Sequence, residues 1–238
     1  MNHLFPYIQR TLLHPNVAIN EQYEALDEVA QLGLAGLVVA PFWVKKHRRE
    51  LGDGHPATLT VAVGYPYGYQ RTEVKQQELE LALADGANAA DVVLNTSALL
   101  SPTSVWLKIE LAKLVAVAHA HEVPLTVVLE SALLTDEQLH RMIKTAADAG
   151  ADGLKNATGA RLPGARLPGA RMPGARMPGV PMPGVLSKPF SLDKALAFRR
   201  AVPSSVGVSI AADGATVTEL EALVAAGVER LAMQRLPG

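Results

Sequence analysis

The sequence predicts an α/β protein in which eight parallel strands close into a barrel. Short apolar runs alternate with amphipathic stretches along the chain, which is the pattern of βα units around a parallel sheet. Eight such runs occur, the number that a closed (β/α)8 TIM barrel needs. The length of 238 residues and the 49% hydrophobic content suit one large domain with a sizeable core. Residues 1–238 are therefore expected to form a single barrel domain.

The candidate strands and helices follow one another in regular order. The strands are expected at 8–12, 36–40, 59–64, 90–94, 125–130, 153–156, 206–211 and 230–233. Amphipathic stretches, several introduced by a Ser, Thr, Asp or Asn that could cap a helix, lie at 20–32, 73–84, 104–121, 136–149, 192–201 and 218–226. A basic run at 45–49 opens a further helix after the second strand. We expect a solvated face there, not a nucleic-acid patch, because no aromatic residues interleave it beyond Phe42 and Trp43.

Composition excludes several classes of protein. The absence of cysteine excludes disulfides, a thiol nucleophile and thiolate metal sites, and it fits a reducing cytoplasm. The N-terminus has no basic region ahead of an apolar run, and no stretch approaches the ~18 apolar residues of a membrane span. The formal net charge of −1 argues against nucleic acid as a partner. We therefore expect a soluble, cytoplasmic protein that binds neither membrane nor nucleic acid.

The sequence also gives no sign of a metal or cofactor. His119 and His121 are two residues apart on a predicted helix, so their side chains point in different directions and make a poor metal pair. No dinucleotide fingerprint and no phosphate-binding P-loop is present. No metal and no cofactor are expected.

Lys155 has the sequence context of a lysine that forms a Schiff base. An apolar strand ends at this residue, and a turn of small residues follows at once. An amine that forms an imine must be partly neutral near pH 7, so it needs an apolar wall for desolvation and an opening for the carbonyl substrate. The carboxyl end of a barrel strand supplies both, because the chemistry of such barrels gathers there.

Residues 160–184 form five pentapeptides that read ARLPG, ARLPG, ARMPG, ARMPG and VPMPG. Pro followed by Gly is the favoured central pair of a type II turn, so one turn every five residues is the natural conformation, and helix and central strand are excluded. The regular spacing predicts one stripe of arginines and one apolar stripe, formed by Arg161, Arg166, Arg171 and Arg176 and by Leu162, Leu167, Met172, Met177 and Met182.

Three interpretations of this 25-residue Pro/Gly/Arg tract stay open. It can be a low-complexity expansion with little function. It can be a lid whose arginines bind an anion. It can also be an ordered arm that docks on another subunit or protein, a reading that the similar C-terminal sequence QRLPG at 234–238 favours.

Several segments of the chain resemble the deoxyribose-phosphate aldolase family, class I aldolases with a TIM-barrel fold. Together the segments cover most of residues 8–159, and a weaker match resumes from about 191 to 231. The matching segments are RTLLHP at 10–15, LVVAPFW at 37–43, VGYPYG at 63–68 with EVK at 73–75 and Glu78, GANAADVV at 86–93 with Asn95, VLE at 128–130 with LT at 134–135, and GADGLK at 150–155 with TG at 158–159.

The resemblance implies roles for single residues. Lys155 falls on the lysine that forms the imine, and Asp91 on the carboxylate that relays protons through water. Further residues are expected to bind substrate, namely Asn95, Thr158 and Gly159 of the matching segments and Ser209 of the weaker match. The pentapeptide tract is then an insertion after the sixth strand, at the catalytic mouth, where Arg161 and Arg166 are candidates to contact a phosphate or another anion.

The chain departs from the family at three polar positions of the barrel. Ser209 stands where the family carries a second lysine on the seventh strand, whose positive charge lowers the pKa of the imine-forming lysine. Thr126 replaces a further lysine on the fifth strand. Gln9 replaces an acidic residue on the first strand. Desolvation alone must then keep the reactive amine neutral.

The family's phosphate site is altered as well. There, backbone N–H groups of a Gly-Gly pair after the seventh strand and of a Gly-Thr-Ser turn after the eighth face the substrate phosphate, as in other anion sites. The aligned residues here are 212–213, Ala-Asp, and 232–234, Ala-Met-Gln. The carboxylate of Asp213 would repel a phosphate, which predicts a substrate without one.

Two functions of different classes follow. The first is an aldolase-like lyase that makes or breaks a carbon–carbon bond through an imine on Lys155, with a small-molecule aldehyde or sugar as substrate. The alternative is a catalytically degenerate barrel that acts in assembly or binding through the pentapeptide arm. In both cases we expect a homo-oligomer, with residues 160–184 as a candidate contact.

Overall fold

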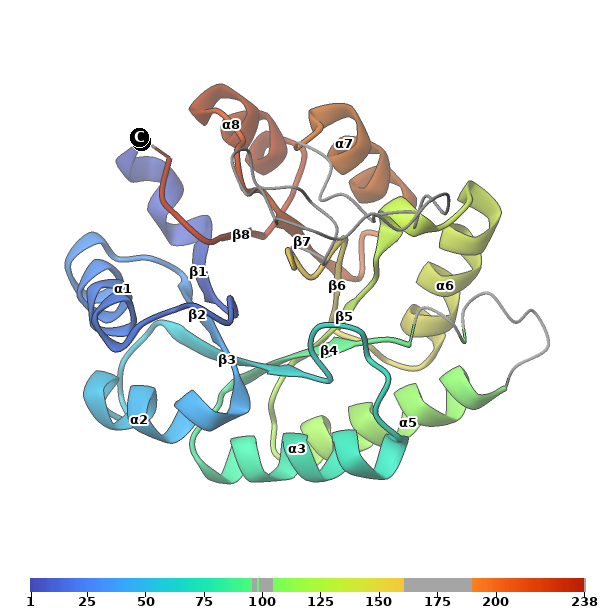
Figure 1. Cartoon of the computed structure of the whole chain (residues 1–238). Coiled ribbons are helices and arrows are strands. Elements are labelled where there is room, and N and C mark those ends of the chain that lie inside the picture. Colours follow the sequence, from blue (N-terminus) through green and yellow to red (C-terminus); the bar gives the residue numbers. More distant parts are fainter. Residues whose placement is uncertain (96–97, 99–104, 161–189, 238) are drawn as a thin grey trace, which may run out of the picture.

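The computed structural model describes residues 1–95, 98, 105–160 and 190–237. Eight parallel strands form a closed barrel in the order β1-β2-β3-β4-β5-β6-β7-β8, with helices around the outside (Figure 1). The strands are β1 Ile8–Leu12, β2 Gly36–Val39, β3 Thr58–Val63, β4 Ala89–Val93, β5 Leu125–Val128, β6 Gly153–Lys155, β7 Gly207–Ala211 and β8 Arg230–Met233. The expected (β/α)8 TIM barrel is confirmed, and each predicted strand agrees with the observed one to within two residues at either end.

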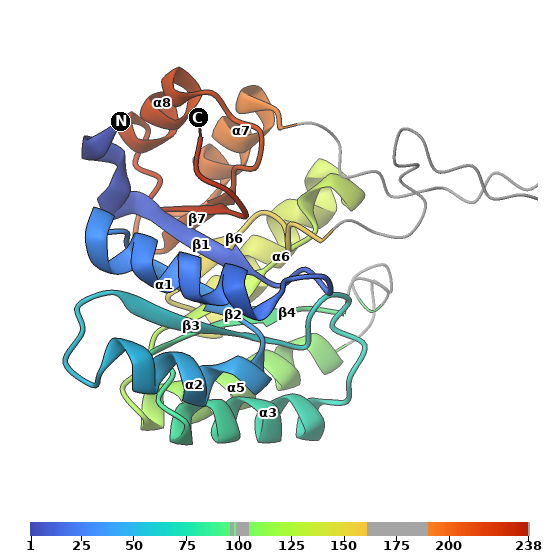
Figure 2. The ribbon, with the colours of Figure 1, turned by 60° about the vertical axis from the view of Figure 1, so that its left-hand side comes forward.

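Helices follow most strands and cover the barrel. They are α1 Ile19–Leu32, α2 Pro41–Leu51, α3 Thr72–Ala84, α5 Trp106–Ala120, α6 Asp136–Asp148, α7 Leu192–Ala201 and α8 Val217–Ala225, together with the short 3-10 helices η1 Asn2–Tyr7 and η2 Ser131–Leu133. Both chain termini lie on one side of the molecule, next to α8 (Figure 2). Within the described residues, no helix is long and apolar enough to cross a membrane.

Local sequence explains where these helices begin and end. Thr135 and Thr216 each form a capping box with the residue three positions later, so the N–H groups of Gln138 and Glu219 and those of both threonines have side-chain partners. Pro41 occupies the first position of α2, where its missing N–H costs nothing. Gly33 ends α1 in the left-handed conformation, with φ of 70°.

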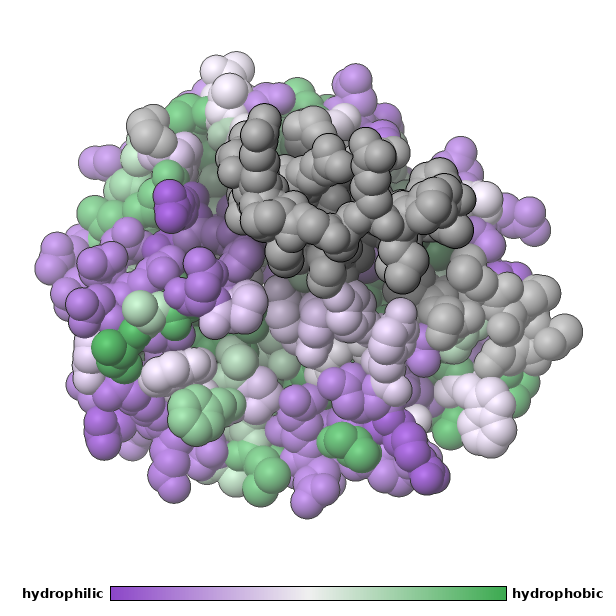
Figure 3. Space-filling model, viewed as in Figure 1, coloured by the Kyte–Doolittle hydropathy of each residue, from purple (hydrophilic) through white to green (hydrophobic). Residues whose placement is uncertain are grey.

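The main hydrophobic core lies between the strands and the helices. Leu37 and Val39 of β2 belong to one large buried cluster, whereas Val38 between them belongs to a separate small cluster with Leu13 and Ala62. This alternation is the period of two expected for a strand, with one face toward the helices and the other toward the barrel axis. Burial of each large aliphatic side chain contributes roughly 1.5–3 kcal/mol. The visible outer surface, in contrast, is mainly hydrophilic (Figure 3).

The prediction for the basic run at 45–49 was wrong in two respects. The helix begins at Pro41 and not at the run. The run is also only partly solvated, because His47 and Arg48 are buried. Arg48 donates a hydrogen bond to the carbonyl oxygen of Gly86 at 2.8 Å, which ties α2 to the loop before β4. It also donates to the carbonyl oxygen of Gly52 at 3.2 Å, at the end of its own helix. Residues 161–184 of the predicted arm lie outside the described part of the chain.

Candidate active site

Lys155 and Asp91 meet inside the barrel. Lys155 is the last residue of β6, Asp91 lies on β4, and Lys155 Nζ donates a hydrogen bond to Asp91 Oδ2 at 2.8 Å. Since β5 separates their strands, the two side chains can meet only by pointing toward the barrel axis. Both side chains are buried, with exposed fractions of 1% and 5%. The structure thus brings together the two residues predicted to be catalytic.

Polar side chains surround this pair in the barrel interior. Gln9 Nε2 donates to the hydroxyl oxygens of Thr58 at 3.0 Å and Thr60 at 3.3 Å. Thr126 is the register partner of both Asp91 and Gly153. A Cβ on Gly153 would lie 2.8 Å from Thr126 Oγ1, so glycine leaves the room that this threonine occupies. Bulky branched side chains usually fill such interiors; a hydroxyl-rich interior suits a polar ligand instead.

Two buried hydroxyls in the barrel have no hydrogen-bond partner among the described residues. They are Ser209 Oγ on β7 and Thr11 Oγ1 on β1. Ser209 is the register partner of Lys155, so the position where the family motif has a second lysine lies beside Lys155 on the neighbouring strand. An unsatisfied buried hydroxyl costs about 1–3 kcal/mol, and such groups commonly bind water or a ligand. A substrate contact by Ser209 stays a prediction.

The other predicted substrate residues form the loops at the carboxyl ends of the strands. Asn95 Oδ1 accepts the backbone N–H of Ala98 at 3.3 Å. The Thr158 N–H donates to Glu130 Oε1 at 2.8 Å, and the Thr158 hydroxyl donates to the same oxygen. The carbonyl oxygen of Gly159 accepts a hydrogen bond from Gln234 Nε2 at 3.0 Å. Substrate contacts by these residues stay predictions, and Arg161 and Arg166 lie outside the described residues.

Tyr65 is a functional candidate that our sequence reasoning did not single out. It lies two residues after the end of β3 and packs against the small interior cluster of Leu13, Val38 and Ala62. Ala62 is the register partner of Asp91, so the ring lies over the β3 side of the site. Burial raises the pKa of the Tyr65 phenol to about 12, and the negative charge of Glu130 adds to this shift. The sequence could have indicated Tyr65 by its position directly after the predicted strand 59–64, because functional residues of such barrels lie at the carboxyl ends of the strands.

A buried ion pair supports β4 from outside the barrel. Lys75 on α3 is fully buried, and its Nζ donates to Glu110 Oε1 on α5 and to the carbonyl oxygen of Val93, both at 2.8 Å. Burial lowers the pKa of Lys75, and the Glu110 carboxylate opposes that shift. The neighbouring Glu78 accepts the Gly64 N–H at 2.7 Å, and burial raises the pKa of this carboxyl. This network holds the carboxyl ends of β3 and β4 in place.

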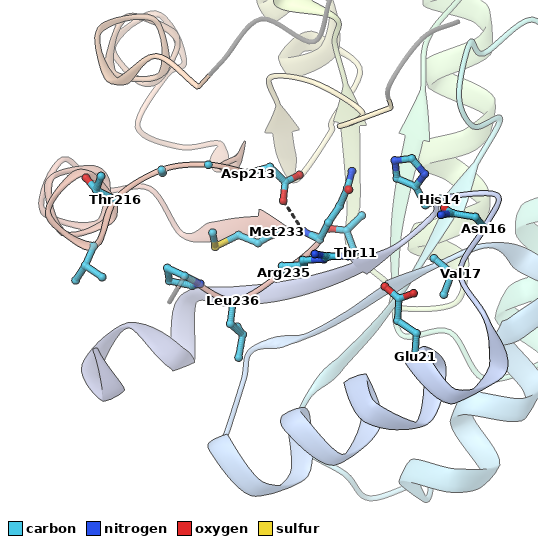
Figure 4. Close-up of a pocket in the computed structure, with 15 residues that line it drawn as sticks. Thr11, His14, Asn16, Val17, Glu21, Asp213, Thr216, Met233, Arg235 and Leu236 are labelled. Atoms are coloured by element: carbon cyan, nitrogen blue, oxygen red, sulfur yellow. Dashed lines mark hydrogen bonds between the residues drawn. The ribbon is translucent and has the colours of Figure 1, made fainter. Parts of the chain in front are cut away.

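A cavity of about 670 Å³ lies at the carboxyl ends of β1, β7 and β8 (Figure 4). Its wall includes Thr11, Asp213 and the C-terminal segment 234–237, but neither Lys155 nor Asp91. The cavity adjoins the loop that follows Lys155 through the hydrogen bond from Gln234 to Gly159.

Two backbone N–H groups at this cavity have carboxylate partners. Asp213 Oδ1 accepts the N–H of Gln234 at 2.6 Å, which joins the ends of β7 and β8. Glu219 Oε2 accepts the Thr216 N–H at 2.8 Å at the start of α8, and this hydrogen bond lowers the pKa of Glu219. Groups of this kind bind anions when they are free. Here the carboxylates of Asp213 and Glu219 already accept these two N–H groups. In the described part of the chain, no group of three or more metal-ligating side chains is placed to hold a metal ion.

Comparison with known proteins gives relatives along most of the barrel. Deoxyribose-phosphate aldolases from Bacillus mycoides and Thermococcus kodakarensis are 32% and 34% identical over 152 and 155 residues, 64% of this chain and 67% and 69% of theirs. The enzyme from Lactiplantibacillus plantarum is 31% identical over 153 residues, 71% of its length. No family model matches the chain.

Solved structures show the same fold at lower identity. QR15, an aldolase, superposes with a TM-score of 0.78 at 21% identity, covering 98% of this chain and 92% of that chain. The tetrameric deoxyribose phosphate aldolase from Aeropyrum pernix gives a TM-score of 0.77 at 22% identity, covering 98% and 87%.

The closed barrel with a buried lysine and carboxylate at its catalytic end defines a barrel enzyme of the class I aldolase type. The identity and coverage of the relatives make the assignment more specific: the chain belongs to the deoxyribose-phosphate aldolase family. The family that the sequence motifs indicated is thereby confirmed.

Proposed function

We propose that the protein is an aldehyde-lyase that reversibly cleaves a carbon–carbon bond through a Schiff base on Lys155. The observation that carries this proposal is the 2.8 Å contact between Lys155 Nζ and Asp91 Oδ2 inside the barrel. An amine nucleophile needs a partner that takes up its proton, and the carboxylate lies within hydrogen-bond reach.

The reaction begins with imine formation. Lys155 Nζ passes a proton to Asp91, and the free amine attacks the carbonyl carbon of the substrate. A C–N bond forms, and the carbonyl oxygen leaves as water after taking one proton from the amine and one from Asp91. The product is a protonated imine, which withdraws electrons from the neighbouring carbon.

Carbon–carbon cleavage follows from this electron withdrawal. Asp91, ionised again, removes the proton of the hydroxyl on the β-carbon through a water molecule. The O–H electrons form a carbonyl group, the bond between the α- and β-carbons breaks, and its electron pair neutralises the imine to an enamine. Asp91 returns the proton to the α-carbon, and water hydrolyses the imine to release the second aldehyde.

The geometry favours a substrate that lacks a phosphate. The relatives are named for a phosphorylated sugar. In this chain, however, Asp213 accepts the Gln234 N–H, and Glu219 accepts the N–H of Thr216, the residue before α8. A phosphate would have to compete with these carboxylates for backbone donors, and like charges at such distances are unfavourable.

Proton exchange at acetaldehyde tests the proposal without a second substrate. If an enamine forms on Lys155, its protonation in D2O places deuterium in the methyl group of acetaldehyde, which NMR detects. We expect exchange with the native protein and none with Lys155→Met. Exchange that persists in Lys155→Met, or that is absent from the native protein, would contradict the proposed reaction.

A second candidate function is a barrel without catalysis that acts in assembly or binding through residues 160–184. It is favoured by Ser209, Thr126 and Gln9, which replace charged residues of the family. We also infer a cytoplasmic homo-oligomer; among the similar structures, the Aeropyrum pernix aldolase is tetrameric. Deletion of 160–184 should then reduce the assembly size measured by light scattering. An unchanged size would exclude the arm as the contact.

A further inference from the structure

We propose that Tyr65 is a further catalytic residue, whose phenol donates a hydrogen bond to the oxygen on the β-carbon of the substrate. This oxygen becomes the carbonyl oxygen of the aldehyde that leaves when the carbon–carbon bond breaks. The inference rests on the proposed function and adds to it a residue that acts on the leaving half of the substrate, whereas Lys155 acts on the half that stays bound as the imine.

The ring of Tyr65 lies over the interior of the barrel. On β3, Thr60 and Ala62 face the interior, since Thr60 accepts a hydrogen bond from Gln9 and Ala62 belongs to the small interior cluster. Tyr65 lies two residues after the end of this strand and packs against that cluster. Because Ala62 is the register partner of Asp91, the ring packs on the part of the interior that adjoins this carboxylate.

Tyr65 and Lys155 approach the mouth of the barrel from opposite sides. The cluster on which the ring packs includes Val38 of β2, and Lys155 ends β6. In a closed barrel of eight strands, β2 and β6 lie opposite each other, and β4, which carries Asp91, lies midway between them. A substrate that extends from Lys155 toward the phenol therefore passes Asp91, the group that we assign to take the proton of the β-hydroxyl.

The Tyr65 hydroxyl is available to a substrate oxygen. The side chain is half-buried, and its hydroxyl makes no hydrogen bond with the residues that the structure describes. A tyrosine hydroxyl usually finds a partner where the ring is buried, and at the mouth of a site a ligand or water can be that partner. The two other tyrosines of this loop differ: Tyr67 and Tyr69 stack on each other with ring centroids 5.3 Å apart, and Tyr69 is 65% exposed.

The phenol is a donor and not a base at neutral pH. Burial raises the pKa of Tyr65 to about 12, and the negative charge of Glu130 adds to this shift. Glu130 is held at the same rim, because its Oε1 accepts the Thr158 N–H at 2.8 Å and also the Thr158 hydroxyl.

The donor acts on charge that develops during cleavage. The β-hydroxyl loses its proton to Asp91 through water, and its oxygen carries negative charge until the carbon–carbon bond has broken. The phenol proton stays on Tyr65 throughout, and the hydrogen bond that it makes stabilises this oxygen. Removal of one such donor commonly costs roughly 100-fold to 1,000-fold in kcat.

Two reactions separate this role from that of Lys155. Deuterium exchange at acetaldehyde needs only the imine and the enamine, because acetaldehyde has no β-oxygen. Cleavage of 3-hydroxybutanal to acetaldehyde needs the β-oxygen as well, and this substrate has no other hydroxyl. Tyr65→Phe keeps the ring and should lower kcat for cleavage by roughly 100-fold, while exchange stays within about threefold of the native rate. Tyr69→Phe, at the exposed position of the same loop, should change neither.

The pH dependence gives a second readout. Since the phenol keeps its proton up to a pKa of about 12, the ratio of native to Tyr65→Phe cleavage rates should be constant from about pH 6 to about pH 9. The proposal is overturned if Tyr65→Phe cleaves 3-hydroxybutanal at the native rate, if cleavage and exchange fall together, or if the ratio titrates in this range. Failure of the proposed function would appear differently, as absent exchange with the native protein, and it would overturn this inference as well.

Discussion

Ser209 lies beside Lys155 in register on neighbouring strands, and its hydroxyl oxygen is buried without a hydrogen-bond partner among the described residues. In relatives that carry a lysine at this position, two amines would lie side by side. Here Lys155 Nζ is paired with the Asp91 carboxylate at 2.8 Å. Among the described residues, the Lys155 amine is therefore both buried and paired with the Asp91 carboxylate.

Ser209→Lys should increase retro-aldol turnover. A second ammonium beside Lys155 repels its charged form and favours the neutral amine that attacks a carbonyl. Each 1.4 kcal/mol of repulsion raises the neutral fraction by about tenfold. The measurement is acetaldehyde release from 2-deoxyribose. Ser209→Met is the control, because it adds similar volume without charge. Equal rates in the two variants would show that the missing charge does not limit the reaction.

Asp91→Asn should lower turnover by about 100-fold or more while the protein stays folded. The amide keeps the shape of the carboxylate but cannot accept the proton of Lys155 or of the substrate hydroxyl, and positioned proton transfer contributes roughly 100-fold to 10,000-fold. Turnover and circular dichroism of the variant give the comparison. Turnover within about threefold of the native rate would remove Asp91 from the proposed proton path.

Lys75→Met should lower the free energy of unfolding by about 3–5 kcal/mol, because it leaves Glu110 buried without its cation. Adding Glu110→Leu should recover most of this loss, since the uncompensated charge is then gone as well. Lys144→Met is the control: the Lys144–Asp148 pair is exposed, and such a pair contributes under about 1 kcal/mol. Denaturant titration measures all three. A Lys75→Met loss no larger than the control would refute the support that we assign to this pair.

His47 should make the fold less stable at mildly acidic pH. Burial lowers the pKa of this imidazole from its usual 6.5, so below about pH 6.5 the unfolded chain binds a proton that the folded chain does not. Its stabilising contribution is complete above that pH and falls as the pH decreases toward the folded pKa, by at most about 1.4 kcal/mol per pH unit.

His47→Leu should flatten this part of the stability curve between pH 7.5 and 5.5, and denaturant titrations at both pH values measure the difference. His121→Gln, at an exposed position, should leave the curve as it is. A curve for His47→Leu that matches the native one would assign the pH dependence to other groups.

The strands and Lys155 could be predicted because each rests on a local pattern. Apolar runs of strand length defined the barrel and placed Lys155 and Asp91 on strands, and the resemblance to the family singled out Asp91. The burial of His47 could not be predicted in this way, since a basic run does not reveal which helix face packs on the barrel. The bond between Asp213 and the Gln234 N–H joins two loops 21 residues apart, and sequence alone indicated only that a carboxylate had entered an anion site.

Borohydride trapping followed by mass spectrometry tests the central claim most directly. The protein is incubated with acetaldehyde, reduced with borohydride and digested, and the modified peptide is sequenced. Because an imine is reducible and the free aldehyde leaves no covalent mark on other buried amines, we predict an ethyl group on Lys155 and none on the equally buried Lys75. No adduct on Lys155 across a panel of small aldehydes and ketones, or equal labelling of Lys75, would contradict the assignment of Lys155 as the Schiff-base residue.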